Sequence, residues 1–335
     1  MNYRKLGRSG LDVSTICLGA MNFGGATDAA TSAQIIGDAH ARGVNFIDTA
    51  DVYSDGRSEE IVGRAIKASR NSWVVATKVG NAFDKIRNHR GLSRAWIMQA
   101  CEASLRRLGL ETIDIYYLHR EDHGTALEET VMAVGDLVRA GKIRYFGLSN
   151  FRAWRVAEIC NVCDRLGIGR PVVSQPYYNA MNRMPETEHL PACGYYGLGV
   201  VPYSPLARGV LSGKYAPGAA PQADTRAGRA DARIMQTEWR PESLVLAQKI
   251  KAHAQGRGMT SGQFALLWVL NNAHVSSAIA GPRTPEQWAD YVDALGHSFS
   301  AQDEALVDGL VAAGHPSTPG YNDPAYPIEG RPTRS

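Results

Sequence analysis

The chain has 335 residues, of which 44% are apolar and 21% are charged, with a formal net charge of +3. This composition is typical of a soluble globular enzyme, and the small, scattered positive charge argues against a nucleic-acid partner. No apolar run approaches the roughly 20 residues of a membrane span, the N-terminus does not resemble a signal peptide, and five widely spread cysteines favour a reducing cytoplasm.

Short apolar, β-branched runs recur along the chain, and most are followed by a helical pattern. The predicted strands begin at Ile16, Asn45, Val74, Ile113, Tyr145, Val172, Gly199 and Ser276. The clearest helical patterns cover residues 29–42, 58–69, 93–108, 125–140 and 152–166. In the segment 93–108, apolar residues recur at the helical period, with Ser93 placed to cap the start and Gly109 to end the helix.

Strands that alternate with helices in this number predict a (β/α)₈ barrel, forming one domain over residues 1–335. A doubly wound sheet is the alternative, but it would need a G-x-G-x-x-G sequence after the first strand, and none is present there. Alternation around Ser9 and Gly10 predicts an N-terminal β-hairpin that closes the bottom of the barrel.

Two segments lack a clear period. Residues 216–238, after the seventh predicted strand, are rich in Ala, Gly, Arg and Asp. They are predicted to form a long loop on the catalytic rim, which is either a lid or a disordered segment. Residues 315–335 contain five prolines and are predicted to lie extended across a surface, where they would border a substrate pocket.

Ionisable side chains follow three neighbouring predicted strands at their carboxyl ends, where barrel enzymes carry their active sites. Asp48 ends the second strand with Tyr53 in the loop after it, Lys78 follows the third strand, and His119 ends the fourth. Each residue alone has an ordinary structural explanation, such as a capped turn or a packed histidine. Their occurrence together predicts an active site.

These four side chains suit the protonation of a carbonyl oxygen. A free tyrosine has a pKa of about 10, and the Lys78 ammonium is expected to lower the pKa of Tyr53. Asp48 would hold Lys78 in place and charged, while His119 would donate a hydrogen bond to the substrate oxygen. Protonation is half of a carbonyl reduction, and the other half is a hydride that no side chain supplies.

The segments DTADVYSDGRSEEIVGRAI and YRKLGRSGLDVSTICLGAMNFGG resemble the aldo-keto reductase family, and the resemblance extends to about Tyr291. It implies NADPH/NADP⁺ as the cofactor, bound without a Rossmann fold, and a small aldehyde, ketone or alcohol as the substrate. The implied catalytic residues are Asp48, Tyr53, Lys78 and His119, with Tyr53 as the general acid.

The resemblance also implies a set of cofactor-binding residues, in which Tyr203 would stack on the nicotinamide. Near the nicotinamide it places Ser149, Asn150 and Gln175, and the set also includes Gly19, Met21 and Asp48. Around the diphosphate it places Ser204, Leu206, Arg208 and Lys214, and at the adenosine phosphate Gly281, Arg283 and Gln287.

The sequence around Arg283 predicts a preference for NADPH over NADH. Thr284, Pro285 and Gln287 form a helix-start signal, and a helix N-terminus binds phosphate. Arg283 could add a charged contact to the 2′-phosphate that NADH lacks. Asp290, one helical turn beyond Gln287, would weaken that binding if it faced the same way.

Two departures from the family pattern concern the substrate pocket and the adenine site. Met21 stands where better-known carbonyl-reducing branches carry tryptophan, and Asp290-Tyr291 stand where Glu-Asn is common. The substrate, its size and the oligomeric state cannot be read from the sequence.

Two other functions stay open beside the reductase. One is an NADPH-binding regulatory protein similar to potassium-channel β-subunits, with slow turnover. The other is a metal-dependent sugar isomerase, which needs carboxylates at several successive strand ends where this chain shows one. No metal site is predicted, because Cys160 and Cys163 favour packing and the His119/His123 pair lacks a third ligand.

Overall fold

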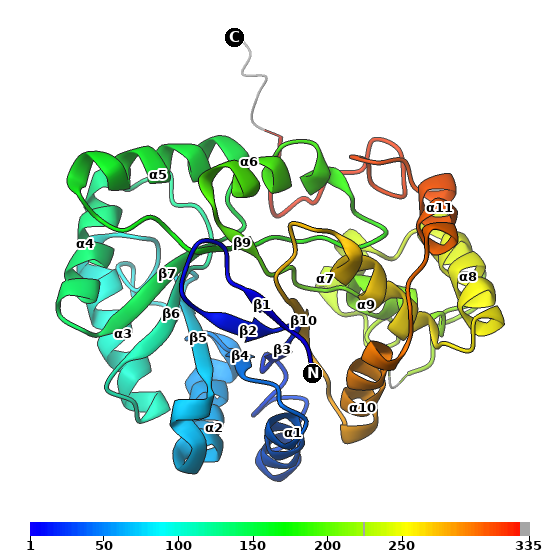
Figure 1. The fold of residues 1–335 in the computed structure, drawn as a ribbon, viewed down its shortest axis with the longest axis horizontal. Helices are drawn as coiled ribbons and strands as arrows, with labels where there is room; N and C mark the ends of the chain where they lie inside the picture. The colour runs from blue at the N-terminus through cyan, green and yellow to red at the C-terminus, as the bar shows by residue number, and fades with distance from the viewer. Residues whose placement is uncertain (224, 329–335) are drawn as a thin grey trace, which may run out of the picture. The chain divides into compact units, whose positions relative to one another are not determined.

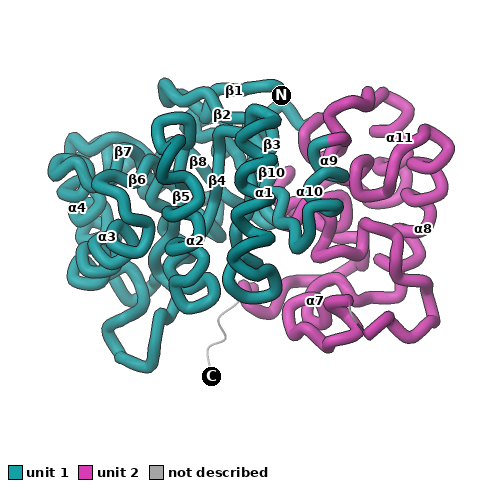
Figure 2. The backbone as a smooth tube through the Cα atoms, turned by 90° about the horizontal axis from the view of Figure 1, so that it is seen from below, with its two compact units in different colours: residues 1–177, 188–203, 272–292 teal, residues 178–187, 204–271, 293–335 magenta. Residues whose placement is uncertain are grey.

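The computed structural model describes residues 1–223 and 225–328. One residue of the predicted 216–238 loop and the last part of the predicted tail, residues 329–335, lie outside the described residues. The chain divides into two compact units (Figure 2). Unit 1 comprises residues 1–177, 188–203 and 272–292, and unit 2 comprises residues 178–187, 204–271 and 293–335. The single domain over residues 1–335 stays a prediction.

Unit 1 is built around eight parallel strands in the order β10-β3-β4-β5-β6-β7-β8-β9. In chain order they are β3 (Ile16–Gly19), β4 (Phe46–Asp48), β5 (Val74–Val79), β6 (Ile113–Leu118), β7 (Ile143–Ser149), β8 (Val173–Gln175), β9 (Gly199–Val200) and β10 (Ala278–Ala280). A parallel bridge from Val200 to Val275 and a 3.0 Å bond from Ile279 N to Pro202 O join the two edge strands. The predicted (β/α)₈ barrel is therefore confirmed.

Helices α1 to α6 follow one another around the outside of these strands (Figure 1). The helices of unit 1 are α1 (Ala29–Ala41), α2 (Arg57–Ile66), α3 (Arg94–Leu108), α4 (Leu127–Arg139), α5 (Ala153–Leu166), α6 (His189–Tyr196) and α10 (Pro285–Asp293), with 3₁₀ turns η1 (Tyr53–Gly56) and η2 (Lys67–Ser72). Ser93 Oγ accepts from Trp96 N at 3.3 Å, and Gly109 ends α3 in the left-handed conformation at φ 64°. Both predicted ends of α3 are confirmed.

The N-terminal hairpin packs against the N-terminal ends of the strands. It pairs β1 (Tyr3–Lys5) with β2 (Asp12–Ser14), and Arg8 N donates to the Gly197 carbonyl, just before β9, at 2.9 Å. Leu6 and Val13 are fully buried and share one core cluster with barrel residues such as Phe46. The hairpin therefore closes the bottom of the barrel, as predicted, and burying each such side chain contributes about 1.5–3 kcal/mol to stability.

Unit 2 contains α7 (Ala232–Thr237), α8 (Pro241–Gly256), α9 (Ser261–Asn271) and α11 (Ala301–Leu310), with η3 (Met184–Glu186), η4 (Ala207–Ser212) and η5 (Ala294–Gly296). Its core includes the buried Trp268 of α9, and the guanidinium of Arg183 lies over the Trp268 ring at 5.5 Å. Arg183 Nη1 also donates to Asp308 at 2.7 Å, which ties the segment before η3 to α11.

The 216–238 segment contains regular structure that its composition did not predict. Helix α7 lies within it, capped by Asp231, and Ile234 and Thr237 are buried. The described part of the tail packs on α7 and α8, because Asp323 pairs with Arg233 at 2.6 Å and Tyr321 stacks under the guanidinium of Arg240 at 3.8 Å. That the segment acts as a lid stays a prediction.

No helix in residues 1–223 or 225–328 is both long enough and apolar enough to cross a membrane.

Candidate active site

The register of the barrel strands brings the predicted catalytic residues to one rim. Asp48 is the last residue of β4, and β5 places Lys78 opposite Tyr117 of β6. His119 directly follows β6, and its backbone N donates to the carbonyl of Val79 at 2.7 Å. The ends of three neighbouring strands therefore present these side chains together, at the carboxyl end where barrel sites lie.

Lys78 is the centre of the group. Its side chain is fully buried, and Nζ donates to Asp48 Oδ1, to the Thr49 carbonyl at 2.7 Å and to Tyr53 Oη at 3.2 Å. Gln175 Nε2 donates to the other Asp48 oxygen at 2.9 Å. Every ammonium hydrogen and both carboxylate oxygens are thus engaged, as a buried ion pair requires.

The pKa values of the pair follow from burial and mutual attraction. Burial lowers the pKa of Lys78, but the Asp48 carboxylate and the Tyr53 oxygen outweigh it, and the net pKa is raised. Burial raises the pKa of Asp48, against the opposing effect of Lys78 and Gln175. We infer that Lys78 remains charged and that Asp48 is its counterion.

The pKa of Tyr53 differs from the expectation drawn from sequence. Burial raises it, and this effect is larger than the lowering caused by the Lys78 ammonium, so the net pKa lies above the ordinary value. The lowered pKa expected from the sequence is therefore wrong in its net sign, because sequence alone gives no measure of desolvation. The phenol is protonated at neutral pH, with Lys78 reducing the energy needed to ionise it.

Tyr53 is held in a tight turn of unusual backbone conformation. Its N–H donates to the Ala50 carbonyl at 3.1 Å. Ser54 and Asp55, the next two residues, have φ of 50° and 56°, in the left-handed region that disfavours side chains. Such strain, about 1–3 kcal/mol per residue, is typical of functional sites.

The His119 imidazole lies against Tyr53, with ring centroids 6.0 Å apart in a T-shaped arrangement. Asn150 Nδ2 donates to the His119 carbonyl at 3.0 Å, and Asn81 Nδ2 lies 3.0 Å from His119 Nδ1. Burial lowers the pKa of His119 well below its usual value, with further lowering by Lys78 and Arg120. The ring is therefore neutral at neutral pH.

The residues assigned to the nicotinamide form one network that reaches Asp48. Tyr203 Oη donates to Asn150 Oδ1 at 2.7 Å, and Asn150 Nδ2 donates to Ser149 Oγ at 3.0 Å. Ser149 Oγ donates to the carbonyl of Gln175 at 3.0 Å, and Gln175 contacts Asp48. One ring face of Tyr203 stacks on Tyr177 at 5.4 Å, so a nicotinamide would need the opposite face.

The residues Gly19 and Gly281 lie where β3 and β10 end side by side. A side chain at Gly19 would meet Ile279 Cγ2 at 2.6 Å, so close packing alone requires glycine there. Asn22 Nδ2 donates to the Gly281 carbonyl at 3.1 Å. The Met21 side chain is 43% exposed, which makes it available to a ligand.

The predicted helix start after Arg283 is present. Gln287 N donates to Thr284 Oγ1 at 3.3 Å, and Gln287 Oε1 accepts from Arg283 N at 2.9 Å. The Arg283 guanidinium has no hydrogen-bond or ion-pair partner in the part of the chain that the structure describes. A half-buried arginine whose guanidinium has no partner among the described residues, placed beside the N-terminus of α10, suits a phosphate.

The residues assigned to the diphosphate, Ser204, Leu206, Arg208 and Lys214, belong to unit 2. The backbone φ angle changes sign between them, with Leu206 at φ −92° and Arg208 at φ 53°. Changes of this kind can turn successive N–H groups toward an anion. Arg208 Nε donates to Thr237 at 3.0 Å, and Lys214 Nζ lies 5.2 Å from the ring centre of Tyr215.

A buried acidic cluster near Lys78 was not predicted from the sequence. Asp51 and Glu59 are both fully buried, and Glu59 accepts from Thr77 at 2.5 Å and from Arg107 at 2.6 Å. Within the described residues, Asp51 Oδ2 and Tyr116 Oη have no hydrogen-bond partner. Burial and then Glu59 raise the pKa of Asp51 to about 7. The high density of acidic residues in DTADVYSDGRSEE is the sequence feature from which this cluster could have been predicted.

No group of three or more His, Cys, Asp or Glu side chains is placed to hold a metal ion in residues 1–223 and 225–328. Cys160 and Cys163 are buried on α5.

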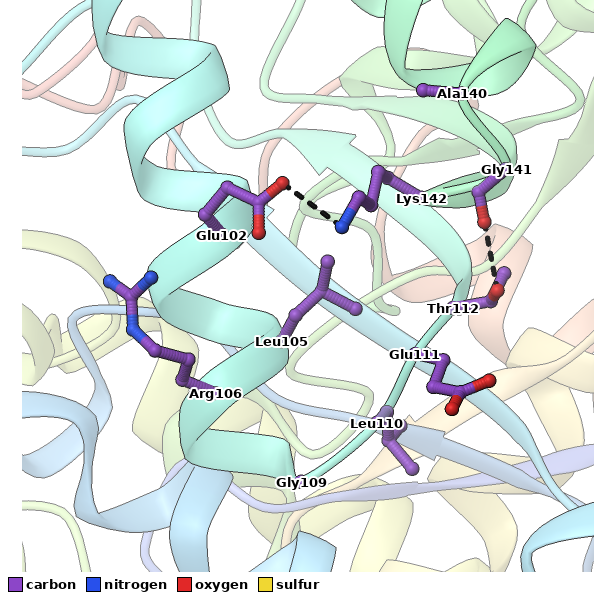
Figure 3. Close-up of a pocket in the computed structure, with 10 residues that line it drawn as sticks. All are labelled: Glu102, Leu105, Arg106, Gly109, Leu110, Glu111, Thr112, Ala140, Gly141 and Lys142. Atoms are coloured by element: carbon purple, nitrogen blue, oxygen red, sulfur yellow. Dashed lines mark hydrogen bonds and ion pairs between the residues drawn. The ribbon is translucent and has the colours of Figure 1, made fainter.

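A pocket lies at the other end of β6, where Thr112 and Lys142 line it with residues of α3 (Figure 3). Six residues of β6 span about 20 Å, so this pocket is remote from Tyr53 and His119.

Known proteins resemble this chain over most of its length. The model of the aldo/keto reductase family matches residues 15–312. A "Probable voltage-gated potassium channel subunit beta" of Arabidopsis thaliana is 37% identical over 302 residues, covering 88% of this chain and 91% of that protein. A "Putative voltage-gated potassium channel subunit beta" of Schizosaccharomyces pombe is 36% identical over 302 residues, covering 88% of each chain. The "Uncharacterized oxidoreductase YrpG" of Bacillus subtilis is 34% identical over 330 residues, covering 95% of this chain and 98% of that protein.

Proposed function

Because the chain belongs to the aldo/keto reductase family, we propose that it is an NADPH-dependent oxidoreductase that interconverts aldehydes or ketones and alcohols. The observation that carries the proposal is the buried Lys78 ammonium, shared between the Asp48 carboxylate and the Tyr53 phenol. A buried charge held against a phenol is costly to build and is typical of a site that moves protons.

Tyr53 is the proton donor in this proposal. Its oxygen accepts a hydrogen bond from Lys78, which leaves the O–H hydrogen for the substrate carbonyl oxygen. As the proton leaves, the ammonium stabilises the phenolate, and Asp48 keeps the ammonium in place. His119, which is neutral and has its ring nearly perpendicular to that of Tyr53, donates a second hydrogen bond to the same oxygen.

NADPH supplies the hydride when it is bound. Ser149, Asn150, Gln175 and Tyr203 would hold its nicotinamide, and Arg283 with the start of α10 its adenosine phosphate. The fit is supported by the Arg283 guanidinium, which has no partner in residues 1–223 and 225–328, and by the donor-rich network that joins Tyr203 to Asp48. Asn150 already bonds to Tyr203 and His119, so its amide would exchange a partner to bind the carboxamide.

A panel of aldehydes and ketones graded by size and polarity tests the proposal. The purified chain is mixed with NADPH and each carbonyl compound, and the nicotinamide absorbance is followed over time. We expect continuous, substrate-dependent oxidation of NADPH with at least one compound. NADPH binding measured by fluorescence without turnover of any compound would contradict the reductase proposal.

A regulatory protein that binds NADPH and turns over slowly is the second candidate, supported by the similarity to the Arabidopsis and Schizosaccharomyces relatives, which are named as potassium channel β subunits. Excess carbonyl added to the preformed NADPH complex separates the two. A regulator is expected to oxidise about one equivalent of NADPH and then stop, because the NADP⁺ formed is released slowly. An enzyme continues to oxidise NADPH through many equivalents.

A further inference from the structure

Asn81 and His119 follow neighbouring strands, and their side chains meet. Asn81 Nδ2 lies 3.0 Å from His119 Nδ1. The register pairs Val79 with Leu118, so the chain leaves β5 and β6 at adjacent points. Gly80, at φ 130°, allows the turn that brings Asn81 back toward the histidine.

The direction of this hydrogen bond determines which ring nitrogen carries hydrogen. An amide nitrogen has two hydrogens and no available lone pair, so Asn81 Nδ2 only donates. His119 Nδ1 must therefore accept. A neutral imidazole that accepts at Nδ1 carries its hydrogen on Nε2.

The surroundings of His119 favour a neutral ring. Burial lowers the pKa of the ring well below its usual value, and the positive charges of Lys78 on β5 and Arg120 on the following loop lower it further. The Tyr53 ring lies nearly perpendicular to the imidazole, and Asn150 Nδ2 donates to the backbone carbonyl of His119 at 3.0 Å. Within the described residues, Asn81 is the side chain that hydrogen-bonds to His119 Nδ1, and it therefore selects between the two neutral tautomers.

We propose that Asn81 is a positioning residue that keeps His119 in the Nε2–H tautomer, which supplies a second hydrogen-bond donor beside the Tyr53 hydroxyl. The inference rests on the proposed function, since that function gives the Nε2–H group a carbonyl oxygen to bind. Asn81 acts only through the ring. Without it, the imidazole could place its hydrogen on Nδ1 and turn a lone pair toward the substrate oxygen.

The tautomer can be measured directly, without turnover. In protein labelled with ¹⁵N-histidine, two-bond ¹H–¹⁵N correlations distinguish a protonated ring nitrogen from an unprotonated one, and His119→Gln identifies the His119 signals. We expect wild-type His119 to show an unprotonated Nδ1 and a protonated Nε2. In Asn81→Asp the carboxylate accepts from the ring, so Nδ1 should become protonated.

Kinetics of the same variants give a second, independent readout. In Asn81→Asp, the neutral ring carries its hydrogen on Nδ1, and the loss of one oxyanion donor should lower kcat by about 10²–10³-fold. At lower pH the ring takes up a second proton, because the carboxylate raises its pKa, and the Nε2–H donor returns. The variant should therefore gain a new pH limb, between about pH 5 and 9, that the wild type lacks.

Two controls separate this effect from damage to the fold. Asn81→Leu removes donor and acceptor together, and it should cost less than about tenfold in kcat and add no pH limb, since neither tautomer is imposed. Asn71→Asp adds the same charge at an exposed residue of η2 and should leave both the NMR signals and the pH profile unchanged.

The outcomes also separate this inference from the proposed function. A protonated Nδ1 in wild-type His119, or an unchanged tautomer in Asn81→Asp, would overturn the role of Asn81 even in an active reductase. The expected NMR pattern in a protein that reduces no carbonyl compound would support the Asn81 contact and reject the reductase proposal.

Discussion

A lysine and a carboxylate pair near each end of strand β6, one pair in water and the other buried. In the pocket of Figure 3, Lys142 and Glu102 lie 3.2 Å apart with side chains 39% and 45% exposed. At the opposite end, Lys78 and Asp48 pair with side chains 0% and 3% exposed. The two pairs carry the same charges and differ in how far their side chains are exposed to water.

Solvent decides what each pair can do. An exposed pair contributes about 0–1 kcal/mol, because water screens the charges and both ions are already hydrated. A buried pair has lost its hydration, so removing one partner leaves an uncompensated charge and costs about 3–5 kcal/mol. The exposed pair at Lys142 therefore adds little to stability. The buried pair at Lys78 is costly to form, as expected of a group that is retained for catalysis.

The largest effect is expected at Tyr53, where the buried pair meets a titratable hydroxyl. Tyr53→Phe keeps the ring and removes the proton, so carbonyl reduction should fall by about 10²–10⁴-fold while NADPH still binds. Steady-state rates and cofactor fluorescence measure the two quantities. Near-normal turnover would assign the proton donor to another residue.

Matched lysine substitutions test the comparison itself. Lys78→Met should lower the free energy of unfolding by about 3–5 kcal/mol at pH 7, and Lys142→Met by less than about 1 kcal/mol. Urea unfolding followed by circular dichroism measures both. Because burial raises the pKa of Asp48, its protonation at lower pH should reduce the loss in Lys78→Met. Similar losses for the two variants would refute the distinction.

Asp51→Asn extends the comparison to a buried acid without a hydrogen-bonded cation. The folded-state pKa of Asp51 is about 7, above its unfolded value, so folding favours the protonated form. The contribution of Asp51 to stability should consequently fall as pH rises from about 4 to 7, and above that window the variant should be more stable than the wild type by about 2–4 kcal/mol. Denaturation at a series of pH values checks this, with equal profiles as the contrary result.

A smaller effect than at Tyr53 or Lys78, confined to cofactor binding, is expected at the half-buried residue Arg283. A charged hydrogen bond of this kind is worth about 1.5–3 kcal/mol, so Arg283→Ala should weaken NADPH binding by about ten- to a hundred-fold and leave NADH nearly unchanged. Fluorescence titration gives both dissociation constants. Equal losses would move Arg283 away from the 2′-phosphate, and no loss would leave it in solvent.

Local sequence patterns determined the elements of unit 1. The eight strands were readable because each is a short apolar run between helical patterns, and the limits of α3 were readable because Ser93 and Gly109 act on their own neighbours. The rim position of Asp48, Lys78 and His119 followed from barrel geometry, since every parallel strand presents its carboxyl end on one side.

Only the tertiary structure decided which of these residues contact one another and how deeply each side chain is buried. Gln175 contacts Asp48 across 127 positions of sequence, and Asn81 meets His119 across 38. The pKa of Tyr53 moved opposite to expectation because burial outweighed the neighbouring ammonium. Hydrophobic period and capping are properties of adjacent residues, so the sequence carries them directly; desolvation and long-range contact depend on every strand that closes around the site, and they exist only once the barrel is formed.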